Sequence, residues 1–258
     1  MRSLSSPAIA AFATSGLNIV GVASGEPYQN ILPGCRAVIV IASGGKSLWS
    51  SFTREIERHP DYFIGCTDPL DDFVERMQRR VDPDPGPDRR WVRCAATESV
   101  FVDFRILGQA AGIGWHSRLG LLLHPEFGPW LGLRLACFTT EPLPSTGPPA
   151  GTGPCANCPA PCVVACPAAA VDPRMDWNPT RCSSFHENST QCRTTCHARA
   201  ACPEGASHRY TEVQFHYHSD RLSGRRLLAA SLGLPEDDLG AGPHWRDYAE
   251  SSLLTGRS

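Results

Sequence analysis

Two features that would define common functional classes are missing from this chain. Its 258 residues contain no apolar run of about 18 residues, the minimum for a membrane-spanning helix. It also has no excess of positive charge, because 24 Lys and Arg residues face 26 Asp and Glu residues. A broad nucleic-acid surface normally needs a basic face. We therefore expect neither a membrane span nor an extended nucleic-acid interface.

A complete phosphate-binding loop is missing as well. The sequence SGGKS follows an apolar run at 36–42, but the motif GxxxxGK[ST] needs a glycine where Val40 stands. We therefore interpret Gly44 and Gly45 as a turn between a strand and a helix.

Cysteine is abundant and unevenly placed. The chain has 12 cysteines, and eight of them lie between residues 155 and 202 in two runs, each ending in Cys-Pro. The first run holds Cys155, Cys158, Cys162 and Cys166; the second holds Cys182, Cys192, Cys196 and Cys202. Thiolates are the soft ligands that iron–sulfur clusters prefer, and a [4Fe–4S] cluster needs four of them. The two runs therefore predict an iron–sulfur module.

In two-cluster ferredoxins the cysteine before proline ligates the other cluster. That rule predicts one cluster on Cys155, Cys158, Cys162 and Cys202, and another on Cys166, Cys182, Cys192 and Cys196. Three residues separate Cys158 from Cys162 where two are usual, and the second run is wider still, so one cluster is better supported than two. Two zinc sites, or a disulfide framework in an oxidising compartment, are the alternatives.

The rest of the chain predicts a mixed α and β fold with an adequate core, since 41% of residues are hydrophobic. Apolar and β-branched runs predict strands at 17–23, 36–42, 90–97 and 131–139. Amphipathic patterns predict helices near the start (rather than a signal peptide) and at 48–58, 70–80, 100–111 and 220–235.

A linker rich in Pro, Gly, Ser and Thr at 142–154 suggests the domain boundaries. We expect an α/β domain at 1–145, an iron–sulfur module at 146–210, and a C-terminal helix with a loosely held surface tail from Glu236 at 211–258. Apolar residues alternate at 213, 215 and 217, and the nearby His208, His216 and His218 are expected to pack or face solvent. Free thiols predict a cytoplasmic protein.

Two stretches together resemble the cobalamin-dependent iron–sulfur reductases typified by epoxyqueuosine reductase, with reductive dehalogenases as more distant relatives. One is the double cysteine run. The other is VFVDFRILGQAAGIGWHSRLGLLLHPEFGPW at 100–130, and LPGCRAVIVIA at 32–42 adds a similar strand entry. The matching residues of the longer stretch are Asp103, Gly112, Gly114, Trp115, Arg118, Leu121, Leu122, Pro125, Phe127, Gly128 and Trp130.

The resemblance implies a nitroreductase-like α/β domain that binds cobalamin beside a ferredoxin-like [4Fe–4S] module. It implies electron transfer from one or two clusters to the cobalamin, with Asp103 as general acid. Gly112, Gly114, Trp115, Arg118 and Pro125 would bind the cofactor. Ordinary structural roles stay open: a helix N-terminal carboxylate for Asp103, a helix C-terminal turn for the glycines and core packing for the tryptophans.

The chain resembles a truncated member of that family, without the C-terminal helical-repeat domain and with a shorter segment between residues 23 and 32. With the net charge of −2, this makes tRNA a doubtful substrate. We expect an oxidoreductase acting on a small molecule or modified nucleoside, with a donor such as ferredoxin or flavodoxin. The alternatives are a ferredoxin-type electron carrier without catalysis and a corrinoid-binding or trafficking protein.

Overall fold

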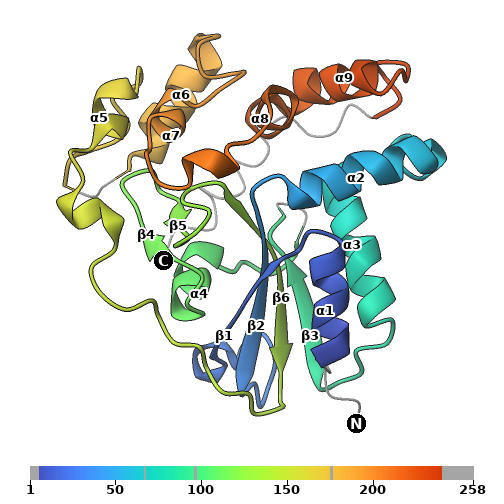
Figure 1. Ribbon diagram of the computed structural model, residues 1–258. Helices are drawn as coiled ribbons and strands as arrows, with labels where there is room; N and C mark the ends of the chain where they lie inside the picture. Colours follow the sequence, from blue (N-terminus) through green and yellow to red (C-terminus); the bar gives the residue numbers. More distant parts are fainter. Residues whose placement is uncertain (1–5, 67, 96–97, 175–176, 240–258) are drawn as a thin grey trace.

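A four-stranded antiparallel sheet forms the centre of the chain in a computed structural model, which describes residues 6–66, 68–95, 98–174 and 177–239 (Figure 1). The strand order is β1 (Ile19–Ser24), β2 (Ala37–Gly44), β6 (Leu131–Thr139), β3 (Arg89–Arg93). Every residue of β2 is buried, because helices or loops cover both faces at the middle of the sheet. The four predicted strands are thus confirmed, and the mixed α and β composition with them.

One face of the sheet packs against three helices predicted from their amphipathic patterns: α1 (Ser6–Thr14), α2 (Ser47–Arg58) and α3 (Pro69–Val81). Phe52 of α2 and Phe73 of α3 are buried in this core with Leu135 of β6. The Asp68 carboxylate caps α3 by accepting a 3.2 Å bond from the Asp71 N–H, as expected of an N-cap acid. Gly45 has a φ of 62° between β2 and α2, which confirms the strand-to-helix turn.

The opposite face carries α4 (Phe104–Ala110) and a small hairpin of β4 (Trp115–His116) and β5 (Leu122–Leu123). Leu107 and Leu122 bury themselves there against the sheet residues Val40 and Ala136. Helix α4 begins later than the predicted 100–111, because Asp103 caps it instead of lying inside its first turn.

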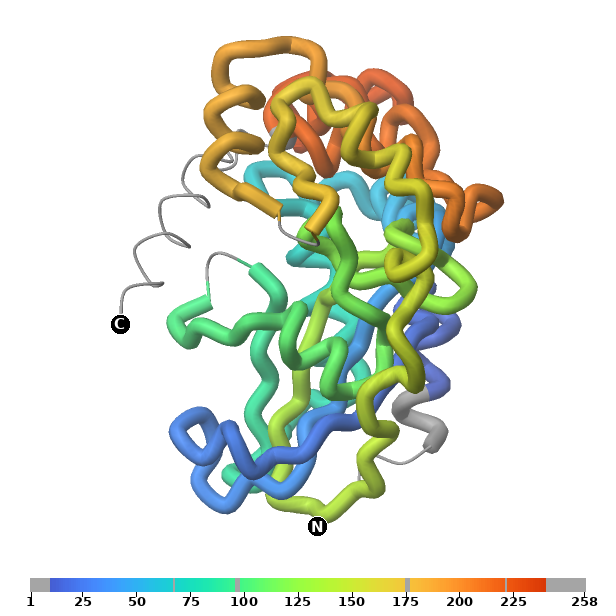
Figure 2. Tube along the Cα trace, turned by 90° about the vertical axis from the view of Figure 1, so that its left-hand side faces the viewer, coloured from blue at the N-terminus to red at the C-terminus, as the bar shows by residue number. Residues whose placement is uncertain are grey.

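The linker after β6 carries the chain back along the whole sheet to the end where the cysteines gather (Figure 2). It is fixed on the way: the Thr146 N–H donates to the Val22 carbonyl at 2.9 Å, and the Thr146 hydroxyl donates to the Ala111 carbonyl at 2.6 Å. A proline- and glycine-rich segment therefore lies in one defined path over β1 and α4.

The cysteine region follows as short helices: η3 (Pro154–Asn157), α5 (Pro161–Ala165), α6 (Pro179–Asn188) and α7 (His197–Ala200). Further short turns of 3₁₀ helix are η1 (Glu26–Tyr28), η2 (Pro60–Tyr62) and η4 (Ala206–His208). Figure 1 shows α5, α6 and α7 above the β4–β5 hairpin, at one end of the α/β body.

Two helices close the described chain: α8 (Glu212–Ser219) and α9 (Arg221–Ser231). The alternation at 213–217 therefore does not form a strand, and the helical period buries Phe215 and Tyr217 instead. Tyr217 and Leu228 join the core of α2 and α3. Leu239 is also buried there, so the start of the expected surface tail is packed, while residues 240–258 lie outside the described residues. No helix in the described ranges has the length and apolarity to cross a membrane.

Candidate functional site

The first predicted ligand set surrounds a cavity. Cys155, Cys158, Cys162 and Cys202 all line it, and the β4–β5 segment closes it with Ser117, Arg118, Leu119 and Leu123. The remaining lining residues are prolines and one acid: Pro154, Pro161, Pro203 and Glu204. The structure thus brings Cys202 from the second run to the three leading cysteines of the first, as the Cys-Pro rule predicts.

Arg118, between β4 and β5, joins the hairpin to the cysteine region. Its Nη1 donates to the Cys155 carbonyl at 2.7 Å, and its Nε donates to the Pro173 carbonyl at 3.0 Å. Burial and the thiols of Cys155 and Cys158 raise the pKa of Cys162, and the Arg118 charge opposes that rise. Arg118 was predicted to bind a cofactor, and its position beside four thiols makes the first cluster the group it would stabilise.

The second predicted set also comes together. Burial, together with the smaller effects of the Cys196, Cys182 and Cys166 thiols, raises the pKa of Cys192 to about 11. Charges affect a pKa only at short range, so the four thiols are neighbours. They come from different segments: Cys166 follows α5, Cys182 lies in α6, Cys192 lies in a loop and Cys196 precedes α7. The Ala170 N–H points at the Cys166 sulfur, 3.4 Å away, as N–H groups do around cluster thiolates.

The arrangement of thiols fits clusters better than the alternatives. All 12 cysteines are among the described residues, and each is a free thiol. Four thiols around a cavity provide the donor set that an iron–sulfur cube needs. Burial is the main cause that raises the pKa values of Cys192 and Cys202 to about 11, and a bound iron–sulfur cluster would favour their thiolate forms.

Arg199 ties the second set to the α/β body. It lies on α7 between Cys196 and Cys202, and its Nε and Nη2 donate to the Pro129 carbonyl at 3.1 and 2.6 Å. Its guanidinium also contacts three aromatic rings, with centroid distances of 4.9, 4.6 and 5.7 Å to Trp130, Tyr210 and Phe215. Sequence reasoning missed this residue, because its partners come from three separate segments.

Asp103 caps helix α4. One carboxylate oxygen accepts from the backbone N–H groups of Arg105 and Ile106 at 2.9 and 3.3 Å, and the other faces the Arg105 guanidinium at 3.3 Å. Burial raises the pKa of Asp103, but the Arg105 side chain and these backbone bonds outweigh it and hold the pKa below its usual value. As it stands the group is an ionised helix cap.

The remaining predicted cofactor residues make chain contacts. Gly112 has a φ of 74° at the end of α4, and a Cβ there would lie 2.5 Å from the Gly147 carbonyl oxygen. A Cβ on Gly114 would lie 2.3 Å from the Leu123 carbonyl oxygen. Trp115 donates its Nε1–H to the Ala150 carbonyl at 3.2 Å, and Pro125 is exposed in the turn after β5. These residues fix the linker and hairpin, and a corrinoid contact by them stays a prediction.

A polar group that no sequence motif marks lies beyond the end of β3. Cys94 is an exposed residue, but the chain packs around its sulfur, and this burial raises the pKa of the thiol to about 12. The charge of Arg134 lowers that pKa, and the charges of Asp71 and Asp103 raise it. Asp103 therefore shares its surroundings with Arg134 and Asp71, two charged residues from β6 and α3.

No model of a protein family matches the chain. Curated proteins do match. The chain is 34% identical over 116 residues to an epoxyqueuosine reductase of Synechococcus sp. strain CC9605, covering 44% of the chain and 34% of that protein. An epoxyqueuosine reductase of Prochlorococcus marinus strain NATL2A is 31% identical over 171 residues, covering 64% and 52%. The chain thus spans about a third to a half of the length of the curated relatives it matches.

Solved structures show the same fold. An epoxyqueuosine reductase from Bacillus subtilis has a TM-score of 0.57 at 16% identity, covering 96% of this chain and 79% of that chain. A catabolic reductive dehalogenase in complex with 3-bromo-4-hydroxybenzoic acid has a TM-score of 0.55 at 17% identity, covering 98% and 37%. The fold is therefore one shared by two classes of reductase. Within them, the sequence matches make the chain a homologue of the epoxyqueuosine reductases, which confirms the predicted resemblance.

Proposed function

We propose that the chain is a corrinoid-dependent iron–sulfur oxidoreductase. The observation that carries the proposal is the cavity lined by Cys155, Cys158, Cys162 and Cys202 and closed by the β4–β5 hairpin. That hairpin belongs to the stretch that resembles the reductase family, so the first ligand set lies directly against the expected catalytic domain. We assign residues 1–145 to a nitroreductase-like domain, 146–210 to a ferredoxin-like module and 211–258 to a C-terminal helix and tail.

The cofactor assignment rests on chemistry and on the neighbours' names. One reductive dehalogenase neighbour is described as performing B12-dependent dehalogenation. Bound clusters would supply single electrons, and a bound corrinoid would supply the reducing metal centre. The corrinoid's peripheral amides donate and accept hydrogen bonds. Gln109 of α4 offers one partner, because its Oε1 is buried with no hydrogen-bond partner among the described residues.

Asp103 is the residue we assign to proton delivery. A proton donor must be protonated at the working pH, whereas Arg105 and the helix N-terminus favour the carboxylate. The assignment therefore requires Asp103 to leave its cap contacts before it can donate. A structure of the Bacillus subtilis enzyme has an aspartate-bearing catalytic loop swung out of the active site, which supports such movement.

We propose a small molecule or modified nucleoside as substrate. One epoxyqueuosine reductase structure contains a tRNA-Tyr stem loop with the epoxyqueuosine modification. The net charge of −2 gives this chain little electrostatic attraction for an intact RNA backbone. A low-potential carrier such as ferredoxin or flavodoxin would supply the electrons, in the cytoplasm where free thiols persist.

The test is anaerobic reconstitution of the full chain with iron, sulfide and cobalamin, followed by gel filtration, iron counting and visible spectroscopy. About eight irons per chain with co-eluting corrinoid would support two clusters and the reductase, since each cube holds four irons. About four irons would restrict the proposal to one cluster. Iron without corrinoid would favour the electron carrier instead.

Asp103→Asn separates chemistry from binding. The amide keeps the cap's oxygen acceptor but cannot donate a carboxylic proton, so we expect turnover to be lost while iron content and the corrinoid spectrum are kept. Ser145→Ala is a matched surface control, because it removes one hydroxyl bond to the Val22 carbonyl far from the thiols. Full turnover in Asp103→Asn would remove Asp103 from the mechanism.

A further inference from the structure

Arg134 is placed by an irregularity in the central sheet. In the β2–β6 ladder Ile41 pairs with Leu135 and Ala42 pairs with Leu133, so Arg134 is the extra residue of a β-bulge. A bulge turns the extra side chain away from the regular alternation and is common beside active sites. Here it follows two partly buried residues and precedes a fully buried stretch of the strand, Leu135 to Thr139. The strand thus carries an arginine at the end nearest the cysteine module.

Among the described residues, the Arg134 guanidinium forms no ion pair, and its Nε has no hydrogen-bond partner. It folds over Gly132, where a Cβ would lie 2.8 Å from its Nη2 and 3.0 Å from its Nε. The Nε is buried and has no hydrogen-bond partner among the described residues. A buried donor left without an acceptor costs free energy, so native proteins fill such positions with water or a ligand.

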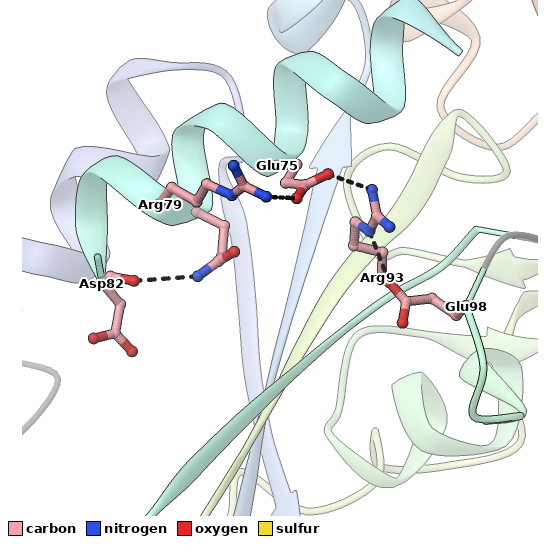
Figure 3. Close-up of polar contacts among 6 residues, drawn as sticks. Glu75, Arg79, Asp82, Arg93 and Glu98 are labelled. Carbon is pink, nitrogen blue, oxygen red and sulfur yellow. Dashed lines mark hydrogen bonds and ion pairs between the residues drawn. The ribbon is translucent and has the colours of Figure 1, made fainter. Parts of the chain in front are cut away.

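The neighbouring arginines differ from Arg134 in this respect. Arg93 lies between two acids, with its Nη1 2.5 Å from Glu75 and its Nε 2.7 Å from Glu98 (Figure 3). Arg225 of α9 is paired with Asp68 at 3.6 Å. The charge of Arg134 is therefore the one among these three that no described carboxylate contacts directly.

Two other groups face Arg134. Asp71 of α3 is close enough for Arg134 to lower its pKa, but burial dominates and raises that pKa above its usual value. On α8, burial together with the charges of Arg134 and Arg199 lowers the pKa of His218 well below its usual range, so His218 is neutral at pH 7. Asp71 is thus an acid close enough for Arg134 to act on it, and no ion pair joins the two within the described residues.

Arg134 also adjoins the proposed reaction site. Its carbonyl accepts a 2.8 Å bond from the N–H of Cys94, an exposed residue. Helix α4, which Asp103 caps, packs on β6 beside Arg134, because a Cβ on Gly108 would lie 3.1 Å from the Leu133 side chain. The charges of Arg134 and Asp103 both act on the Cys94 thiol. A molecule that reaches Cys94 therefore comes close to both the arginine and the assigned proton donor.

We propose that Arg134 binds an oxyanion of the substrate, a carboxylate or a phosphate, beside Asp103. This rests on the proposed function, because it names the substrate class of that same site. The guanidinium presents paired N–H groups that match carboxylate and phosphate oxygens. Asp71 competes with the oxyanion for Arg134, so binding is expected to be strongest where Asp71 carries no charge.

The experiment measures binding rather than turnover. Benzoate and inorganic phosphate are titrated calorimetrically into the anaerobically reconstituted full chain, with iron and corrinoid counted in the same preparations. We expect Arg134→Gln to weaken binding of the preferred anion by roughly tenfold or more, as for other charge-assisted bonds. Arg134→Lys should retain part of the affinity, and Asp71→Asn should increase it several-fold. Arg80→Gln is the control. Arg80 lies on α3, and its exposed side chain is paired with Glu55 of α2.

The two anions distinguish a carboxylate substrate from a phosphorylated one. Equal binding by the natural chain and Arg134→Gln, or no binding of either anion by the natural chain, would overturn the inference. If Arg134→Gln fails to fold, the pair Arg134→Lys and Asp71→Asn decides, and no change in either would overturn it as well. Anion binding that depends on Arg134 in a preparation without corrinoid would count against the proposed function alone.

Discussion

The two cysteine sites are alike in ligands and different in attachment. The first encloses a cavity that the β4–β5 hairpin closes, and Arg118 joins its loop to that hairpin through backbone carbonyls. The second lies farther along α6 and α7 and is held through Arg199, whose guanidinium contacts three aromatic rings and the Pro129 carbonyl. The first site therefore lines the α/β body directly. The second is joined to it through Arg199 and through the apolar cluster in which Cys166 and Cys196 pack with Leu119 and Leu123.

This difference suggests an order for electron flow. A cluster on Cys155, Cys158, Cys162 and Cys202 would be the near one, because its wall is part of the catalytic-domain motif. A cluster on the second set would receive electrons from outside and pass them inward. The predictions below test whether the two sites separate in this way.

Loss of a ligand should have the largest effect and should separate the sites. We expect Cys158→Ala to remove the first cluster, about four irons of eight, and Cys192→Ala to remove the second. Iron counting and electron paramagnetic resonance of the reduced protein measure this. Cys66→Ala is the matched control, because Cys66 lies outside both runs. Retention of all iron in Cys158→Ala would contradict the ligand assignment.

Truncation of Arg199 should loosen the second site more than the first. Arg199→Ala removes two hydrogen bonds and the ring contacts, which we expect to cost about 2 kcal/mol in the free energy of unfolding. Thermal denaturation and the rate of iron loss to a chelator measure the effect. Arg199→Lys keeps the charge without the planar fork and should recover less than half. Equal iron loss from both sites would show that Arg199 supports the whole module.

The comparison also shows what sequence could and could not predict. The Cys-Pro rule predicted which thiols lie close together, because both runs end in the same Cys-Pro pair; ligation of a cluster by them stays a prediction. The strands and α2 and α3 followed from their apolar periods. The roles of Arg199 and Arg134 could not be predicted from sequence. The ring contacts of Arg199 come from distant segments, and the β-bulge at Arg134 arises only when the strands pair. The alternating apolar residues at 213–217 suggested a strand but form helix α8. The helix is stabilised by packing against the core of α2 and α3, and the local sequence pattern carries no information about that contact.

Arg118 sets the corresponding test for the first site, with a smaller expected effect. Arg118→Gln loses the charge that favours the Cys162 thiolate and weakens both carbonyl bonds, so we expect the first cluster to be lost to a chelator several-fold faster. The second cluster should be unaffected. Arg226→Gln on α9 is the control, because its ion pair with Asp237 is exposed. Unchanged iron loss would mean that the hairpin's apolar wall suffices.

The smallest expected effect concerns protonation of Asp103, the proposed proton donor. Arg105 helps to hold the Asp103 pKa below its usual value, so the protonated donor should become scarce as pH rises through that low pKa. Arg105→Gln should raise the pKa and move the falling limb of the pH–rate profile to higher pH. The exposed ion pair of Arg105 and Asp103 is worth about 1 kcal/mol or less, so the shift should be less than about one pH unit.

The same pKa also affects stability. Because the folded pKa is lowered, Asp103 stabilises the fold above its unfolded pKa. This contribution is lost as pH falls through the folded pKa, and Arg105→Gln should reduce that loss. An NMR titration of the Asp103 carboxyl carbon checks the pKa without turnover. A raised pKa with an unmoved rate profile would leave Asp103 as a helix cap and assign the proton to another group.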